Sequence, residues 1–163
     1  MSDRQNPLAL GQFERAATSD GVEAGLYQCL IVSVDEGQRQ MLSLAAIEAG
    51  WLVCLCPDAR TALDRVRRMF LHLAIVDLDQ HDLARPAGLG PLVEELSRSG
   101  NLLLIVCGRE ASAQEEIWAR QLGVWLYLPG SIDREDLTAL CGEARQLVVR
   151  LSARELPVGS RLA

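Results

Sequence analysis

The chain lacks lysine altogether, so all 16 of the residues counted as lysine plus arginine are arginines. A P-loop uses a lysine to hold nucleotide phosphates, and pyridoxal enzymes use one to form a Schiff base. Both classes are therefore excluded. A phosphate-binding site in this protein must take its positive charge from arginine or from a metal ion.

Long hydrophobic runs and basic stripes are also missing. No apolar stretch approaches the roughly 20 residues that span a bilayer, and residues 1–25 lack the apolar core of a signal peptide. The net charge of −6 and the scattered arginines oppose binding to nucleic-acid phosphates. We expect a cytoplasmic protein that binds neither membranes nor nucleic acids directly.

The five cysteines do not form a disulfide pattern, because their number is odd and most lie inside apolar runs. Such cysteines are typical of a reduced hydrophobic core. Cys54 and Cys56 are expected to place their sulfur atoms on opposite faces of a strand, which disfavours a shared zinc ion.

Five short apolar runs recur along the chain. They do not alternate with polar residues, and this is typical of strands that are covered on both faces of a parallel sheet. The runs are Cys29 to Val34, Leu52 to Cys56, Leu73 to Val76, Leu102 to Val106, and Val124 to Leu128. The segments between them have helical periodicity, so the order is βαβαβαβαβα. It predicts a doubly wound, flavodoxin-like α/β fold with helices on both faces and strand order 2-1-3-4-5.

Capping signals and composition predict the helix and domain limits. Asp58 is an expected N-cap, and the last helix is expected to begin near Asp133. The other expected helices end at Gly50, span about Leu92 to Ser99, and span about Ser112 to Leu122. We expect one domain over 26–151, with tails at 1–25 and 152–163.

Acidic residues follow two of the predicted strands. Asp35 and Glu36 come after the first run, and Asp77 comes after the third. Since the carboxyl ends of parallel strands lie at one edge of the sheet, the three carboxylates are expected to meet there. Such a cluster favours a bound cation.

Four strand-end motifs carry a resemblance to a known family. They are Ile31-Val32-Ser33-Val34-Asp35-Glu36, Leu73-Ala74-Ile75-Val76-Asp77, Leu103-Leu104-Ile105-Val106-Cys107-Gly108, and Leu122-Gly123-Val124-Trp125-Leu126-Tyr127-Leu128-Pro129. Over residues 28–150 the chain resembles a response-regulator receiver domain, which is the CheY-like family. The resemblance implies that Asp77 is the phosphoacceptor. It also implies that Asp35, Glu36, Asp77 and Asp79 hold Mg²⁺ and that Tyr127 is the switch aromatic.

Two residues depart from the family pattern. Cys107 stands where the family has a serine or threonine, and Leu128 stands where it has a lysine. A thiol is a poor donor to a phosphoryl oxygen, and leucine carries no charge. Arg109 offers a guanidinium in place of the missing lysine. These departures resemble those of degenerate receivers, or pseudo-receivers, in which the fold persists as a docking module.

The aromatic residues near the fifth predicted strand suggest a partner-binding face. Trp125 and Tyr127 are expected on one face of that strand, and Trp118 in the fourth helix would extend the patch. Core packing is the competing interpretation for these residues. Cys107 lies beside them at the expected switch.

The resemblance therefore predicts a stand-alone, non-enzymatic signalling module of a two-component phosphorelay. It would dock to a histidine kinase or an output protein, as a monomer or weak homodimer, with phosphorylation at Asp77 poorly coupled to the switch. One alternative is a purely structural pseudo-receiver. Another is a haloacid-dehalogenase-type phosphatase that uses Asp77 and Asp79, but such sites use a lysine and place the motif on the first strand.

Overall fold

The computed structural model describes residues 27–78, 88–108 and 112–155. Strands and helices alternate along the chain, as the sequence predicts. The elements are β1 (Gln28–Val32), α1 (Glu36–Glu48), β2 (Leu52–Cys56), α2 (Ala59–Val66), β3 (Leu73–Asp77), α3 (Leu89–Ser97), β4 (Leu103–Gly108), α4 (Ala113–Gln121), β5 (Leu126–Pro129) and α5 (Arg134–Glu155).

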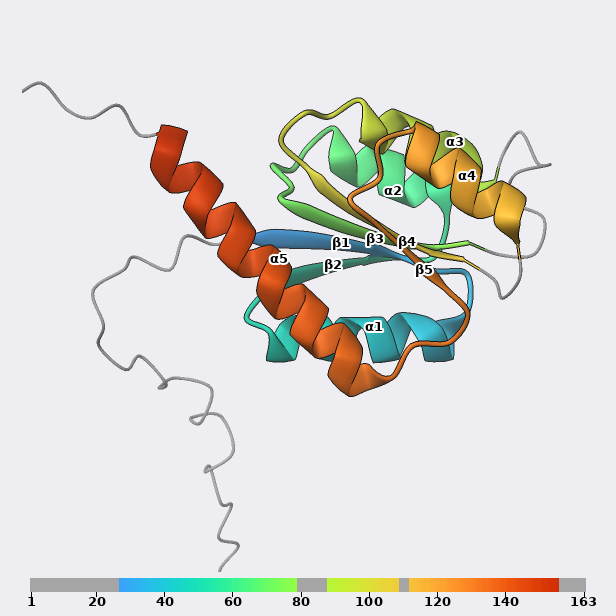
Figure 1. Cartoon of the computed structure of the whole chain (residues 1–163), viewed down its shortest axis with the longest axis horizontal. Helices are drawn as coiled ribbons and strands as arrows, with labels where there is room; N and C mark the ends of the chain where they lie inside the picture. Colours follow the sequence, from blue (N-terminus) through green and yellow to red (C-terminus); the bar gives the residue numbers. More distant parts are fainter. Residues whose placement is uncertain (1–26, 79–87, 109–111, 156–163) are drawn as a thin grey trace, which may run out of the picture.

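The five strands form one parallel sheet in the order β2-β1-β3-β4-β5. Helices α1 and α5 cover one face of the sheet, and α2, α3 and α4 cover the other (Figure 1). The predicted doubly wound fold and its strand order are confirmed. Because β1 lies directly beside β3, the ends of these two strands meet at one edge, with Val32 paired to Val76.

Helix limits follow the capping residues that the sequence offers. Asp58 and Ser112 cap α2 and α4 by accepting hydrogen bonds from the Thr61 and Glu115 amides. Helix α5 runs to Glu155, beyond the predicted domain end at 151, because its helical hydrogen bonding continues through the last polar turn. The remainder of both predicted tails lies outside the described residues. No described helix combines the length and apolarity needed to cross a bilayer.

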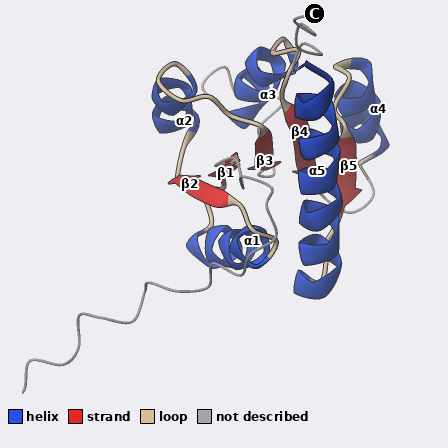
Figure 2. Ribbon diagram, turned by 90° about the vertical axis from the view of Figure 1, so that its left-hand side faces the viewer, coloured by secondary structure: helices blue, strands red, loops and turns tan. Residues whose placement is uncertain are grey.

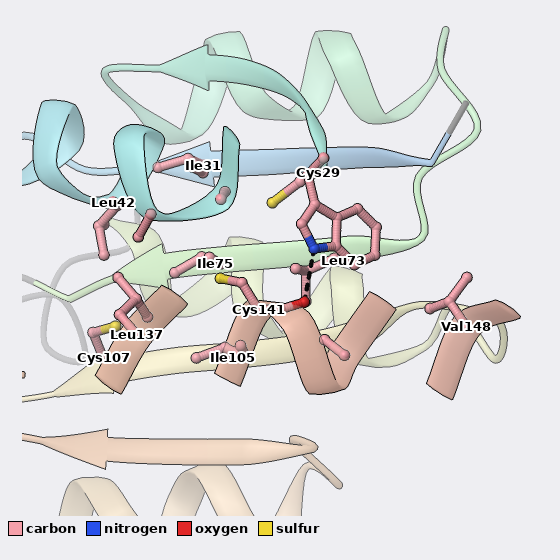
Figure 3. Packing of buried hydrophobic residues seen from close by; sticks show 14 residues of the cluster. Cys29, Ile31, Leu42, Leu73, Ile75, Ile105, Cys107, Leu137, Cys141 and Val148 are labelled. Carbon is pink, nitrogen blue, oxygen red and sulfur yellow. Dashed lines mark hydrogen bonds between the residues drawn. The ribbon is translucent and has the colours of Figure 1, made fainter. Parts of the chain in front are cut away.

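Two hydrophobic layers hold the helices to the sheet. The layer under α1 and α5, drawn in Figure 3, includes Ile31, Ile75 and Ile105 from the three central strands. The layer under α2, α3 and α4 is built from the alternate residues of the same strands, such as Leu30 and Val76. Both sides of each central strand are thus buried, which is why these runs are apolar without alternation.

Trp51 connects the start of β2 to the last helix. It is 3% exposed, and its indole Nε1 donates a 2.9 Å hydrogen bond to the Cys141 carbonyl of α5 (Figure 3). The indole lies just before β2, so this contact ties the edge of the sheet to the last helix.

The expected arrangement of Cys54 and Cys56 is wrong. Residues two apart on a strand point to the same face, and both cysteines belong to the layer under α2, α3 and α4. All five cysteines are free thiols.

Candidate functional site

Asp77 ends β3 at the carboxyl edge of the sheet, and its neighbour there is Ser33. The Ser33 hydroxyl donates a 2.8 Å hydrogen bond to Asp77 Oδ2 and also contacts the Asp35 carbonyl at 3.2 Å. Ser33 is fully buried. The strand-end position beside Asp77 is therefore filled by a neutral hydroxyl.

Asp35 serves as the N-terminal cap of helix α1. Its Oδ1 accepts a 2.7 Å hydrogen bond from the Gln38 amide, and it is the N-cap of α1. Glu36 is the first residue of that helix and is exposed. Both acids lie beyond the strand because β1 ends at Val32, and Val34, which the sequence placed in the strand, is 59% exposed.

The predicted cluster of three carboxylates is consequently not formed. In the described part of the chain, no three His, Cys, Asp or Glu side chains lie close enough together to hold a metal ion. Asp79, the fourth predicted ligand, lies outside the described residues. Mg²⁺ needs near-octahedral oxygen ligands and is bound through one or two carboxylates and several waters. Beside Asp77, the Ser33 hydroxyl occupies the neighbouring strand-end position and Asp35 Oδ1 is engaged by the Gln38 amide, so this edge supplies few of the oxygen ligands that the ion needs.

An arginine stands close to the same edge. Arg39 of α1 donates a 2.7 Å hydrogen bond from Nη1 to the Ser33 carbonyl. The guanidinium thus brings a fixed positive charge to the residue that contacts Asp77. Arg109, the arginine that the sequence proposed for this role, lies outside the described residues.

Cys107 pairs with Asp77 across the β3 and β4 strands and is 3% exposed. Burial, and secondly the charge of Asp77, raises the pKa of the Cys107 thiol to about 12. At neutral pH the thiol therefore stays protonated. It is neither a nucleophile nor a strong hydrogen-bond donor at this edge.

Tyr127 of β5 is held by a buried carboxylate from α4. The tyrosine hydroxyl donates a 2.9 Å hydrogen bond to Glu115 Oε1, and Glu115 is only 6% exposed. Burial, followed by the hydrogen bond and charge of Glu115, raises the pKa of Tyr127 well above its usual value. This contact fixes the ring of the predicted switch residue against α4.

Gly108, the last residue of β4, makes room for this contact. A Cβ atom on Gly108 would overlap both Glu115 Oε1 and the Tyr127 hydroxyl. The Tyr127 and Glu115 pair therefore depends on the absence of a side chain at residue 108.

The three aromatic residues of the predicted partner face do not share one face. Tyr127 and Trp118 pack against the layer under α2, α3 and α4, whereas Trp125 packs against the opposite layer. The prediction for Trp125 is wrong because β5 begins at Leu126, so strand alternation does not extend to residue 125.

Comparison with known proteins gives a result only at the level of structure. No protein-family model matches the chain, and no curated protein matches it. A CheY-like receiver domain protein from Methanospirillum hungatei matches with TM-score 0.67 and 18% identity over 77% of this chain and 98% of that one. The chemotaxis response regulator CheY4 of Vibrio cholerae matches with TM-score 0.61 and 19% identity over 73% and 98%. The chain has the receiver-domain fold.

A further match within this fold is a protein described as a putative pilus assembly protein of Burkholderia thailandensis. Its TM-score is 0.59, with 21% identity over 74% of this chain and 98% of that chain. The receiver fold is therefore shared by solved proteins with different descriptions. What the present receiver fold does must be argued from its own side chains.

Sequence reasoning missed the contacts of Ser33, Arg39 and Glu115. Asp35 followed by Gln38 is a cap-box spacing, which could have identified Asp35 as a cap. Ser33 is the one polar residue in its apolar run, and Ser112 followed by Glu115 is a second cap-box spacing. No sequence signal indicates that Glu115 reaches Tyr127, because that contact is tertiary.

The raised pKa of Tyr127 predicts that its contribution to the free energy of unfolding depends on pH. An unfolded tyrosine ionises near pH 10, whereas folded Tyr127 stays neutral to higher pH, so its contribution to the free energy of unfolding falls as pH rises above about 10. Tyr127→Phe should lower the free energy of unfolding by about 1 kcal/mol at pH 8, and the difference from wild type should shrink as the pH rises above about 10. Urea unfolding of both proteins from pH 8 to 11 measures this; a difference that stays constant across the range contradicts it.

Proposed function

We propose that the chain is a receiver-fold signalling module that acts in the cytoplasm by docking to a protein partner, with Asp77 uncoupled from a metal-dependent phosphoryl switch. The observation that carries the proposal is the 2.8 Å hydrogen bond from Ser33 to Asp77. It places a hydroxyl where a metal-dependent site would need a second carboxylate beside the acceptor.

The chemistry of phosphoryl transfer supports this. An aspartate accepts a phosphoryl group efficiently only where the negative charge of the transferring oxygens is offset, commonly by Mg²⁺. Ser33 and Cys107, which lie beside Asp77, supply a hydroxyl and a protonated thiol, and the family's lysine position is Leu128. Neither group carries the positive charge that Mg²⁺ or a lysine would supply, so we expect Asp77 to accept a phosphoryl group slowly.

The predicted switch residue, Tyr127, is held by a contact of its own. Tyr127 is hydrogen-bonded to buried Glu115, and neither residue depends on Asp77 for this contact. A ring that is fixed in this way keeps the surface formed by α4 and β5 in one conformation. Ile117 of α4 is 55% exposed and offers an apolar contact on that helix. The expected partner is a histidine kinase or an output protein that binds this surface constitutively.

This arrangement favours a pseudo-receiver interaction domain over the phosphatase alternative. Asp77 ends the third strand in the chain rather than the first, and Asp79, the acid that a phosphatase would need, lies outside the described residues. We propose no catalytic turnover for the chain.

A magnesium titration followed by tryptophan fluorescence, repeated with beryllofluoride, tests the proposal. Wild type should show no saturable change up to about 10 mM Mg²⁺, a range in which a two-carboxylate Mg²⁺ site would be occupied. Asp77→Asn should behave in the same way. A saturable response that is lost in Asp77→Asn contradicts the proposal and identifies Asp77 as an active phosphoacceptor.

Ser33→Asp supplies a gain-of-function arm. The second carboxylate would lie against Asp77 and repel it, so the variant should melt at a lower temperature without metal and recover when Mg²⁺ is added. Ser33→Asn, which is similar in size and uncharged, should show no recovery with Mg²⁺. Equal behaviour of the two variants would show that Ser33 is not the residue that excludes the ion.

A further inference from the structure

The two edges of the sheet differ in how they are protected. The β5 edge has a strand of only four residues, which ends in Pro129. The β2 edge has a strand of five residues, Leu-Val-Cys-Leu-Cys, with neither charge nor proline. Natural sheets commonly protect an edge with charge, proline or a short strand. Within the part of the chain that the structure describes, the β2 edge has none of these protections, and no strand pairs with its outer side.

Backbone groups of β2 point alternately toward β1 and away from it. The Leu52 amide donates to the Tyr27 carbonyl at 3.0 Å, and the Cys56 carbonyl accepts from the Ser33 amide at 3.3 Å. The backbone amides and carbonyls of residues 52, 54 and 56 therefore point toward β1. By alternation, the amides and carbonyls of Val53 and Leu55 point outward. Within the described sheet, β1 is the one strand that pairs with β2.

This outward set is complementary to a second copy of itself. In an antiparallel pair centred on Cys54, Val53 of one protomer faces Leu55 of the partner subunit, and the two residues exchange both of their backbone hydrogen bonds. The exposed fractions of Leu52 and Leu55 are 49% and 38%, so the pairing also removes apolar surface from water. No like charges meet along the strand.

The helices beside β2 fit the same twofold arrangement. Helix α2 contacts both β1 and β2, as α1 does, and Figure 2 shows β2 at the free end of the sheet between these two helices. Since paired strands lie about 4.8 Å apart, helices seated over β1 and β2 would come within about 10 Å of their copies, which is a normal packing distance.

Charges on α2 are complementary in this arrangement. The two copies of α2 would run antiparallel, so the exposed Asp58 at the N-terminus of one lies toward the exposed Arg67 and Arg68 beyond the C-terminus of the other. The two helix dipoles also oppose each other favourably. On the opposite face, the two copies of α1 would also run antiparallel, side by side.

We infer that two copies of this chain pair antiparallel through β2 and form one continuous sheet across a twofold axis at Cys54. The backbone amide and carbonyl of Cys54 point toward β1 and not toward the partner strand. Cys54 and the partner's Cys54 therefore form a non-hydrogen-bonded pair with Cα atoms about 4.5 Å apart. That separation lies within the range of disulfides.

Sedimentation of the full chain over about 1 to 100 µM tests the dimer, with Leu55→Lys as the disrupting variant. Lysine at residue 55 places two charges within the paired strands, and it should weaken dimerisation at least tenfold while the monomer stays folded, because Leu55 is already 38% exposed. Leu151→Lys on α5 is the matched control, since Leu151 is also a leucine, is 45% exposed and lies beside Phe70 and Asn101, which precede β3 and β4; it should sediment as wild type.

Diamide oxidation provides a measurement on the wild-type surface. Two Cys54 thiols in the dimer should lose their hydrogens to diamide and form an intermolecular disulfide, which Cys54→Ser abolishes and Cys56→Ser retains. A chain that is monomeric at all concentrations, for instance because another segment of the same chain covers β2, overturns the inference. A dimer that Leu151→Lys disrupts and Leu55→Lys does not also overturns it.

Discussion

Replacing Trp51 by alanine is expected to lower the free energy of unfolding by about 3 to 5 kcal/mol, the usual cost of removing a buried tryptophan. The indole is 3% exposed and belongs to the layer between the sheet and helices α1 and α5. It also donates to the Cys141 carbonyl. Because a domain has only about 5 to 15 kcal/mol of stability in total, this variant should be close to unfolding. Urea denaturation followed by circular dichroism measures the loss.

Trp51→Phe separates packing from hydrogen bonding. Phenylalanine retains most of the buried apolar area but has no N–H group. Cys141 lies inside α5, where its carbonyl is also within reach of helical bonding, so the variant should lose only about 1 to 2 kcal/mol. A loss as large as that of Trp51→Ala would mean that the hydrogen bond, and not the packing, holds α5 in place.

Gly108→Ala is expected to destabilise the protein by about 2 to 3 kcal/mol, in the range of an overpacked core. The added methyl group would overlap Glu115 Oε1 and the Tyr127 hydroxyl. Because Glu115 is buried and Tyr127 is half-buried, either Tyr127 must swing outward or α4 must shift. The same variant should change the fluorescence of Trp118, which lies in α4. Thermal unfolding and emission spectra measure both effects.

Gly142→Ala is the matched control for this substitution. Gly142 lies inside α5, and a Cβ atom there would meet nothing within 4 Å. Alanine should therefore stabilise the chain by about 0.5 to 1 kcal/mol through its higher helix propensity. If Gly108→Ala is as mild as Gly142→Ala, the Tyr127 and Glu115 contact yields easily and does not fix the switch.

Several features of the fold were predictable because they depend on short stretches of sequence. Apolar runs that lack alternation identified five strands, of which the central three are buried on both faces, and Asp58 identified the start of α2. The connections were expected to be right-handed, as such units adopt, and the predicted order 2-1-3-4-5 is the one observed. In each case, the deciding interactions are local or common to every protein with this pattern.

The candidate site was less predictable, since it depends on where the first strand ends, and that end lies two residues earlier than the sequence predicted. The sequence extended the first strand to Val34, which placed Asp35 and Glu36 at its end. In the structure β1 ends at Val32 and Asp35 caps α1. A run of apolar residues shows where a strand lies but not at which residue its hydrogen bonding to the neighbouring strand ends. That end point determines which side chain of the first strand reaches Asp77.

The sequence by itself determined the class of fold, the order of the elements, the reduced cysteines and the absence of any lysine to serve a phosphate site. Only the tertiary structure decided that Ser33 contacts Asp77, that Glu115 holds Tyr127 over Gly108, and that Trp125 faces the opposite layer from Tyr127. The physical reason is one of range. Periodicity and capping are set within a few residues, whereas these contacts join segments whose approach depends on the packing of the whole sheet.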